Sequence, residues 1–306
     1  MFELNYEASY ALHIADMQSR MEQLPSLLGA PDSLDARRHW RMYEFLRPIV
    51  REDPEASWLT IGDTGADAHA LQRLGAKHIV ASCIDDCQIR NLKNRNYIPG
   101  VSVRSINAEA IPDMEPRPDY VLCKEAYHHF PRPDIALYEF LRTARKAVIL
   151  IEPVDLGDSR LLDVGKRLAK KVIRGDSQSH FVFEETGNFI FRLSMRELDK
   201  KLTSIQNRTY YFRLFNDFFC WPLCRHRSDH RLAALTQGLG VAVQDVACRL
   251  GLMAWGLAAV AIPTQSFHVR LGPELELSGF TKRSLPRNPF ACLAPVTRSS
   301  ECQRLR

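Results

Sequence analysis

The residues of this sequence that could do chemistry stand directly after short apolar runs. The first run ends in a tight turn, Gly62-Asp63-Thr64-Gly65, and an amphipathic segment follows it. The later polar groups are Asp85-Asp86, Asn107-Ala108-Glu109, Lys124-Glu125, His128-His129 and Glu152-Pro153. In an open sheet of parallel strands, ligands bind beyond the carboxyl ends of the strands. The spacing therefore predicts that these groups, far apart in the sequence, line one site.

The alternation of apolar runs with helical patterns indicates the elements that would position this site. Strands are predicted at Ser57–Gly62, His78–Cys83, Val101–Ile106, Asp119–Lys124 and Ala147–Glu152. Between them, apolar residues recur at helical spacing near Asp67–Arg73, Cys87–Lys93 and Ile135–Lys146. Such alternation is typical of parallel βαβ units around a buried sheet. The glycine turn would then join a strand to the N-terminus of a helix, where a ligand can approach the backbone closely.

The segments that flank this alternating region have a different character. Residues 1–56 are predicted to form N-terminal helices, and residues 154–250 a mostly helical insertion or lid over the strand ends. Strand character returns at Ala254–Ile262 and Gly279–Leu285. We therefore expect one sheet domain made of residues 57–153 and 251–290. A polar C-terminal tail follows at 291–306, where order is expected to fade.

Composition and charge exclude several classes of protein. The formal net charge of +5 over 306 residues is far from the dense basic stripe of a nucleic-acid binder, so no nucleic acid is expected as a partner. The longest apolar run, Leu252–Ile262, is too short to span a bilayer. Eight cysteines without framework spacing, and no signal-peptide pattern at the start, predict reduced thiols and a cytoplasmic protein. The oligomeric state cannot be read from these features.

Four stretches of the chain resemble the class I S-adenosylmethionine-dependent methyltransferases, in particular those of type 11. They are INAEAIPD at 106–113, DYVLCKEAYHHFPRPDIALYEFLRTARKAVILIEP at 119–153, FEETGNFIFRLSMRELDK at 183–200 and GFTKRSLPRNP at 279–289. The resemblance implies a Rossmann-like α/β sheet that is mostly parallel with an antiparallel last strand, N-terminal helices and a helical insertion. It also implies S-adenosyl-L-methionine as the cofactor and methyl transfer as the activity.

The resemblance further implies which positions surround the cofactor. They are Gly62, Asp63, Thr64, Gly65, Asp85, Asn107, Ala108, Cys123 and Lys124. The glycine turn would line the methionine and ribose part, and Asn107 and Ala108 would meet the adenine edge. Cys83 stands where the family has an acidic residue that binds the ribose hydroxyls, so Asp85 is the candidate for that role. Asp85 could instead cap the helix that begins at Cys87.

Methyl transfer needs mainly geometry, because the sulfonium methyl is already electrophilic. The enzyme must align the acceptor with the S–CH₃ bond and exclude water. A hydroxyl acceptor also benefits from a general base, and the candidates are His128, His129 and, second to them, Glu125. The histidine pair could alternatively serve only to close the strand and begin the next helix. We expect a small-molecule or glycan-type acceptor, methylated at oxygen rather than at nitrogen or carbon.

A competing hypothesis is a degenerate relative that binds the cofactor weakly, or a scaffold, without catalysis. The short glycine turn and Cys83 favour it, whereas the intact stretches 107–109 and 124–129 oppose it. A nicotinamide-dependent oxidoreductase is disfavoured because the turn lacks the GxGxxG pattern with a matching acid.

Three further features are interpreted as structural. Cys220, Cys224, His226 and His230 are metal-ligand types, but their spacing does not match a usual zinc finger, so no metal is expected. The basic residues of 166–174 are interpreted as a solvated helix face. The aromatic residues of 210–221 are interpreted as core or lid packing.

Overall fold

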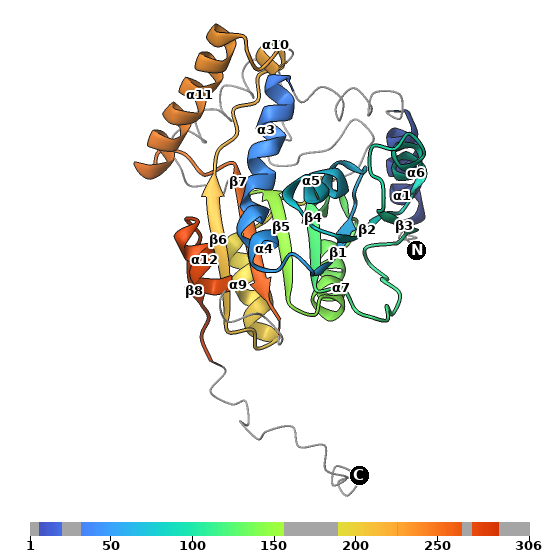
Figure 1. Ribbon diagram of the computed structural model, residues 1–306. Helices are drawn as coiled ribbons and strands as arrows, with labels where there is room; N and C mark the ends of the chain where they lie inside the picture. Colours follow the sequence, from blue (N-terminus) through green and yellow to red (C-terminus); the bar gives the residue numbers. More distant parts are fainter. Residues whose placement is uncertain (1–5, 20–31, 156–188, 225, 265–270, 288–306) are drawn as a thin grey trace, which may run out of the picture.

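The computed structural model describes residues 6–19, 32–155, 189–224, 226–264 and 271–287. One sheet of eight strands runs through it in the order β3-β2-β1-β4-β5-β7-β6-β8, with helices on both faces (Figure 1). The strands are β1 (Ser57–Ile61), β2 (His78–Cys83), β3 (Ser102–Ser105), β4 (Tyr120–Lys124), β5 (Ala147–Pro153), β6 (Thr209–Phe215), β7 (Leu257–Pro263) and β8 (Thr281–Ser284).

The pairing of the strands brings the candidate residues to one edge of the sheet. The pairs β2–β3, β1–β2, β1–β4 and β4–β5 are all parallel, so the carboxyl ends of β1 to β5 lie together. Strand β7 is antiparallel to both β5 and β6, and β8 is antiparallel to β6. The expected α/β architecture, mostly parallel with antiparallel late strands, is confirmed.

Two apolar cores hold helices against the two faces of the sheet. The helices are α1 (Tyr6–Ser19), α3 (Leu34–Tyr43), η1 (Glu44–Leu46), α4 (Arg47–Glu52), α5 (Ala66–Leu74), α6 (Cys87–Asn94), η2 (Tyr127–His129), α7 (Pro133–Thr143), α9 (Met195–Ser204), α10 (Trp221–Cys224), α11 (Arg231–Arg249) and α12 (Leu271–Leu277). Elements α3 to α6 and α12 pack on one face, and α7 and α9 pack on the other. The central strands β4 and β5 are therefore buried from both sides, which explains their nearly continuous apolar sequence.

Local sequence signals set where the helices begin and end. Ser33 Oγ accepts a hydrogen bond from Ala36 N at 3.0 Å at the start of α3, and Ser194 Oγ caps α9 in the same way. Helix α7 begins at Pro133, whose missing N–H is not needed at a first helical position. Helix α5 ends at Gly75 in the left-handed conformation.

Strand β6 lies inside the segment that the sequence indicated to be a helical insertion. Its residues 209–215 belong to the aromatic stretch interpreted as core or lid packing, and they pair with both β7 and β8. The boundaries of the insertion stay a prediction, but the segment contributes a strand to the sheet as well as helices. The basic residues of 166–174 and the tail at 291–306 lie outside the described residues. In the described part of the chain, no helix has the length and apolar character needed to cross a membrane.

Candidate functional site

The turn after β1 is held by one buried carboxylate. Asp63 is 1% exposed and accepts hydrogen bonds from Thr60 Oγ1 at 2.7 Å and Gly65 N at 2.6 Å. Its carboxylate also accepts from the backbone N–H groups of Asp67 and Ala68, both at 3.0 Å. Burial raises the pKa of Asp63, and these hydrogen bonds oppose the rise. The Asp63 carboxylate therefore caps the first turn of α5 and fixes the path of the turn.

The two glycines of this turn allow a backbone path that other residues would block. Gly62 has φ +69°, and a Cβ there would lie 2.4 Å from the Cβ of Ala126. Gly65 has φ +101°, and a Cβ there would lie 2.5 Å from Leu92 Cδ1. Left-handed backbone and the lack of room together favour glycine at both positions. The end of β1 can thus lie directly against the loop that follows β4, with the half-buried Thr64 between the two glycines.

A narrow pocket opens at the carboxyl ends of β1, β2 and β3. It is lined by Tyr10, Ile61, Gly62, Cys83, Ile84, Ile106, Ala108, His129, Phe130 and Pro131. Its free volume of about 20 Å³ is room for about one water molecule. Burial raises the pKa of the Cys83 thiol to about 11, so this thiol is uncharged at neutral pH. The pocket lies where a parallel sheet binds its ligands.

Helix α1 lies against the rim of this pocket. Tyr10 OH donates to Asn107 Oδ1 at 3.3 Å, and Gln18 Nε2 donates to Asp85 Oδ2 at 2.8 Å. The Asp85 carboxylate also accepts from Cys87 N at 3.0 Å, so it binds the start of α6. Asp85 and Asn107, both predicted to bind the cofactor, therefore contact α1 and are not among the residues that line the pocket. A ligand the size of a nucleoside requires α1 to shift.

Lys124 and Glu125 form an ion pair on the face covered by α3. Lys124 Nζ lies 2.6 Å from Glu125 Oε2, and His39 Nδ1 lies 3.3 Å from the same oxygen. Although burial opposes it, the charge of Lys124 and the contact with His39 hold the pKa of Glu125 well below its usual range. Burial, with the nearby charge of Asp63, raises the pKa of Asp67 to about 8 beside this pair. Glu125 is thus ionised and engaged in a polar cluster.

His128 is held by a carboxylate at the end of β5. Its Nδ1 lies 2.6 Å from Glu152 Oε2, and the side chains are 9% and 0% exposed. Because a carboxylate only accepts, Nδ1 is the donor in this contact. Glu152 Oε1 accepts from the backbone N–H groups of Ala126 and Tyr127, both at 3.0 Å. The ring of His128 lies against that of His129, with centroids 3.9 Å apart.

The two predicted histidines therefore take different places. His129 lines the pocket, whereas His128 lies behind it, between His129 and Glu152. Cys123 is fully buried in β4, and its Sγ lies 3.9 Å from Glu152 Oε1. Burial, with the nearby charge of Glu152, raises the pKa of Cys123 well above its usual range.

A second hollow lies beside the same loop, between α7 and α9. Its volume is about 510 Å³, and its lining includes Tyr127, Arg132, Phe191, Glu197 and Lys201. Phe191 N donates to the carbonyl oxygen of His128 at 2.8 Å, so this hollow adjoins the histidine pair. Arg132 is anchored to Glu109, whose carboxylate accepts from Arg132 Nε at 2.6 Å. The hollow combines aromatic side chains with charged ones.

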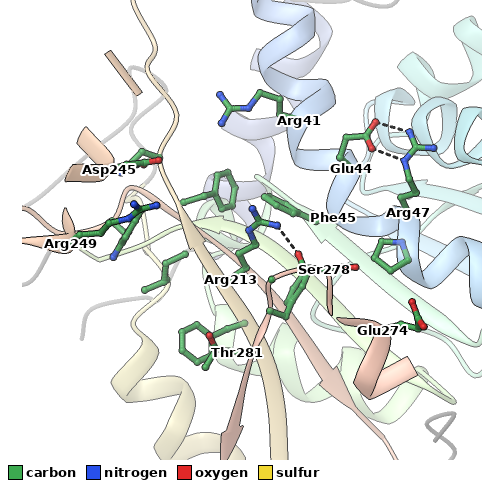
Figure 2. Close-up of a pocket in the computed structure, with 18 of the residues that line it drawn as sticks. Arg41, Glu44, Phe45, Arg47, Arg213, Asp245, Arg249, Glu274, Ser278 and Thr281 are labelled. Carbon is green, nitrogen blue, oxygen red and sulfur yellow. Dashed lines mark hydrogen bonds and ion pairs between the residues drawn. The ribbon is translucent and has the colours of Figure 1, made fainter. Parts of the chain in front are cut away.

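A larger cavity of about 730 Å³ lies elsewhere, over β6 and between α3, α11 and α12. Figure 2 shows Arg213 in its centre, donating to the Ser278 carbonyl at 2.7 Å, and the Glu44–Arg47 ion pair at its side. Strand β6 is four strand spacings from β1, roughly 19 Å at about 4.8 Å each. This distance excludes the cavity as the place where a ligand contacts the glycine turn.

A comparison with protein families identifies the domain that contains this edge of the sheet. Residues 59–151 match the model of a family described as "Methyltransferase domain". The chain carries a class I methyltransferase domain. The match covers β1 to β5 with the turns between them, and it confirms the resemblance seen in the sequence. The cofactor of this methyltransferase is S-adenosylmethionine.

Solved structures of similar arrangement include proteins of different activities. Magnesium protoporphyrin IX methyltransferase from Synechocystis PCC 6803 is 10% identical, with 76% of this chain and 85% of that chain covered and a TM-score of 0.46. The 1,6-didemethyltoxoflavin-N1-methyltransferase of Burkholderia thailandensis is 13% identical, with 87% and 93% covered and a TM-score of 0.49. The [4+2]-cyclase SpnF is 16% identical, with 84% and 96% covered and a TM-score of 0.49. A search of the curated proteins finds no match.

The residues of the pocket fit the cofactor that the methyltransferase domain uses. Apolar walls such as Ile106, Ala108 and Phe130 suit a purine ring, and Gly62 leaves the backbone of β1 accessible on one side. Asp85 and Asn107 supply polar atoms at the rim, where a ribose or adenine edge would need them. The fit requires α1 to move from the rim.

Several residues of the site were missed by reasoning from the sequence. Tyr10 and Gln18 come from an N-terminal helix with no motif, and His39 reaches the site only through the packing of α3. Glu152 was noted at a strand end but given no role. Among the described residues, Cys220, Cys224, His226 and His230 do not assemble into a metal-binding group.

Proposed function

We propose that this methyltransferase transfers the methyl group of S-adenosylmethionine to an oxygen of a small-molecule or glycan-type acceptor. The observation that carries the proposal is the buried His128–Glu152 pair beside the cofactor pocket. An oxygen acceptor must lose a proton during the transfer, and a histidine fixed by a carboxylate is suited to take it. An acceptor that attacks through an unprotonated amine would not need such a pair.

We propose that the nine predicted cofactor residues act on the cofactor through different kinds of contact. Gly62 and Ala108 would contact the cofactor through the pocket wall, and Asp85 and Asn107 would do so at the rim once α1 has shifted. The remaining five predicted residues, Asp63, Thr64, Gly65, Cys123 and Lys124, would act through the turn or the strand that they shape. Asp63 does so by holding the turn through four hydrogen bonds.

The catalytic contribution of the chain is orientation and one proton transfer. When bound, the cofactor supplies an electrophilic methyl group, and S-adenosylhomocysteine remains once the S–CH₃ bond has broken and the O–CH₃ bond has formed. His128 Nε2 takes the proton of the acceptor hydroxyl, while Glu152 fixes the ring through Nδ1. His129 lies in the pocket wall next to this base and would help to keep water out.

The hollow beside Tyr127 and Phe191 is the proposed acceptor region. Aromatic faces stack on sugar rings or planar phenols, and charged side chains such as Glu197 and Lys201 can hydrogen-bond hydroxyl groups. The predicted insertion at 154–250 would shape this region, since Phe191 belongs to it. We also propose a cytoplasmic protein without a nucleic-acid partner.

Incubation with methyl-labelled S-adenosylmethionine and panels of phenols and oligosaccharides tests this function. We expect label on an oxygen of one acceptor class, detected by mass spectrometry. His128→Ala should lower the rate constant by about 100-fold or more while S-adenosylhomocysteine affinity stays unchanged. His129→Ala should weaken cofactor affinity, because His129 lines the pocket. The matched control is His78→Ala, since this histidine is 62% exposed at the start of β2.

Two outcomes would count against the proposal in different ways. A His128→Ala variant with the wild-type rate would remove His128 as the base. Cofactor binding without transfer to any oxygen acceptor would favour the non-catalytic relative.

A further inference from the structure

Helix α11 exposes a continuous apolar stripe along its outer face. The stripe consists of Leu232, Leu235, Leu239, Val243, Val246 and Leu250, each 55–70% exposed. Its spacing of three and four residues places all six on one narrow face of an α-helix. In Figure 1, α11 lies at the outer edge of the molecule, away from the centre of the sheet. A contiguous stripe of this length on a monomer marks an interaction surface.

The opposite face of α11 is anchored, so the stripe cannot turn inward. Ala233, Val241 and Cys248 are buried on that face. Asn216 Nδ2 donates to Asp245 Oδ1 at 2.8 Å, and a Cβ at Gly240 would lie 2.6 Å from the ring of Phe218. The helix therefore presents its six apolar side chains outward as a fixed feature of the fold.

The stripe is symmetric about its own centre, near residue 241. Leu239 and Val243 lie two residues from this centre on either side, and Leu232 and Leu250 lie nine residues from it. Leu235 and Val246 lie six and five residues away. When two such helices run antiparallel, each of these residues meets its counterpart on the other copy. A two-fold interface requires this self-complementarity, whereas an unrelated partner does not.

We propose that α11 binds α11 of a second copy of this chain, antiparallel, to form a two-fold homodimer. Burying six apolar side chains on each copy removes roughly 1,000 Å² from water in total, which is about the minimum for a specific interface and typical of a weak one. Gly238 and Ala242 are exposed beside the stripe and allow the two helices to approach closely. An interface of this size predicts weak association that depends on protein concentration.

The charges beside the stripe distinguish a second copy from a membrane surface. Arg231 and Arg249 lie at the two ends of α11, so an antiparallel pair brings arginines of the two copies together. Salt screens that repulsion, and association of two copies should tighten as salt is raised. Binding to anionic lipid through the same arginines should weaken as salt is raised.

Sedimentation velocity of the full chain tests the proposal. Because the interface is small and the dimer therefore weak, the protein concentration should run from about 1 to about 100 micromolar. We expect twice the chain mass at the upper end for the wild type, and a monomer throughout for Leu239→Glu. The Leu239 side chain is solvent-exposed, so the variant should keep the circular dichroism spectrum of the wild type. The matched control is Leu277→Glu on α12, where the leucine is 81% exposed and the mass should stay dimeric.

Cross-linking tests the antiparallel geometry separately. Two copies of residue 242 would lie about 3 Å apart along the helix axis, and two copies of residue 236 about 15 Å apart. A short bis-maleimide should therefore link Ala242→Cys chains but not Thr236→Cys chains, above the background of the wild type with its exposed Cys87. Equal linkage at both positions would mean a parallel pair and would overturn the geometry.

A wild-type chain that stays monomeric at every concentration would overturn the proposal. If that monomer floats with vesicles of phosphatidylglycerol and phosphatidylcholine, and less so at high salt, the stripe binds membrane instead.

Discussion

Asp63 and Glu152 are both buried carboxylates at the carboxyl edge of the sheet, yet their hydrogen bonds lead to different places. Every hydrogen bond of the Asp63 carboxylate goes to its own turn, to β1 or to the first turn of α5. Glu152 accepts from two backbone N–H groups of the loop after β4 and from the ring of His128. The same residue type therefore serves folding at one strand end and positions a titratable side chain at the other.

The comparison predicts that removal of Asp63 has the largest effect on stability. Asp63→Ala leaves three buried backbone N–H groups and the Thr60 hydroxyl without their acceptor. We expect the free energy of unfolding to fall by about 3 kcal/mol or more, measured by urea denaturation. Asp113→Ala is the control, because its side chain is 91% exposed, and it should change stability by less than about 0.5 kcal/mol. Similar losses for both variants would contradict the role given to Asp63.

Glu152→Gln should act mainly on the reaction. The amide keeps the size of the side chain but can no longer fix His128 through an ionised acceptor. With the acceptor found by the labelling screen, we expect the rate constant to fall by about 100-fold while S-adenosylhomocysteine affinity changes little. A variant that loses affinity and rate together would mean that Glu152 supports the pocket rather than the base.

Asp67 should produce a smaller effect, visible in the pH dependence of stability. Its pKa is raised from 3.8 to about 8 in the folded protein, so the folded state holds a proton that the unfolded chain has released. This contribution is fully present below the unfolded pKa and is lost as pH rises through about 8. Urea denaturation from about pH 6 to 9 should show a steeper loss for the wild type than for Asp67→Asn. Equal slopes would contradict the raised pKa.

Four of the first five strands could be predicted because they are short apolar runs bounded by turns, whereas β3 is a mostly polar strand flanked by Val101 and Ile106. Strand β2 has the predicted bounds, β1, β4 and β5 differ from prediction by one residue at one end, and β3 is shorter by one residue at both ends. Strand β6 was missed because its aromatic residues alternate poorly: Tyr210 and Tyr211 are consecutive and both buried. It also pairs only with antiparallel neighbours from later in the chain. The βαβ rhythm that indicated the other strands is absent there.

The position of the site could be predicted from the sequence, but the hydrogen bonds and ion pairs between its side chains could not. Strand ends bring Gly62, Cys83 and Ala108 to one pocket, as the spacing indicated. The pairs His128–Glu152 and Arg132–Glu109 join residues 24 and 23 positions apart through tertiary packing, which no local pattern encodes. The place of Tyr10 at the pocket follows from how α1 lies over the sheet edge, and the apolar residues of α1 are spread around the helix and do not indicate it.

Calorimetric titration with S-adenosylhomocysteine tests whether the pocket at the ends of β1 to β3 binds the cofactor. The wild type should bind in the micromolar range, and Ala108→Leu should weaken binding roughly tenfold or more by filling the pocket. Ala110→Leu, at an exposed position two residues on, should bind as the wild type does. Absence of binding at millimolar ligand, or unchanged affinity of Ala108→Leu, would mean that this pocket does not bind the cofactor.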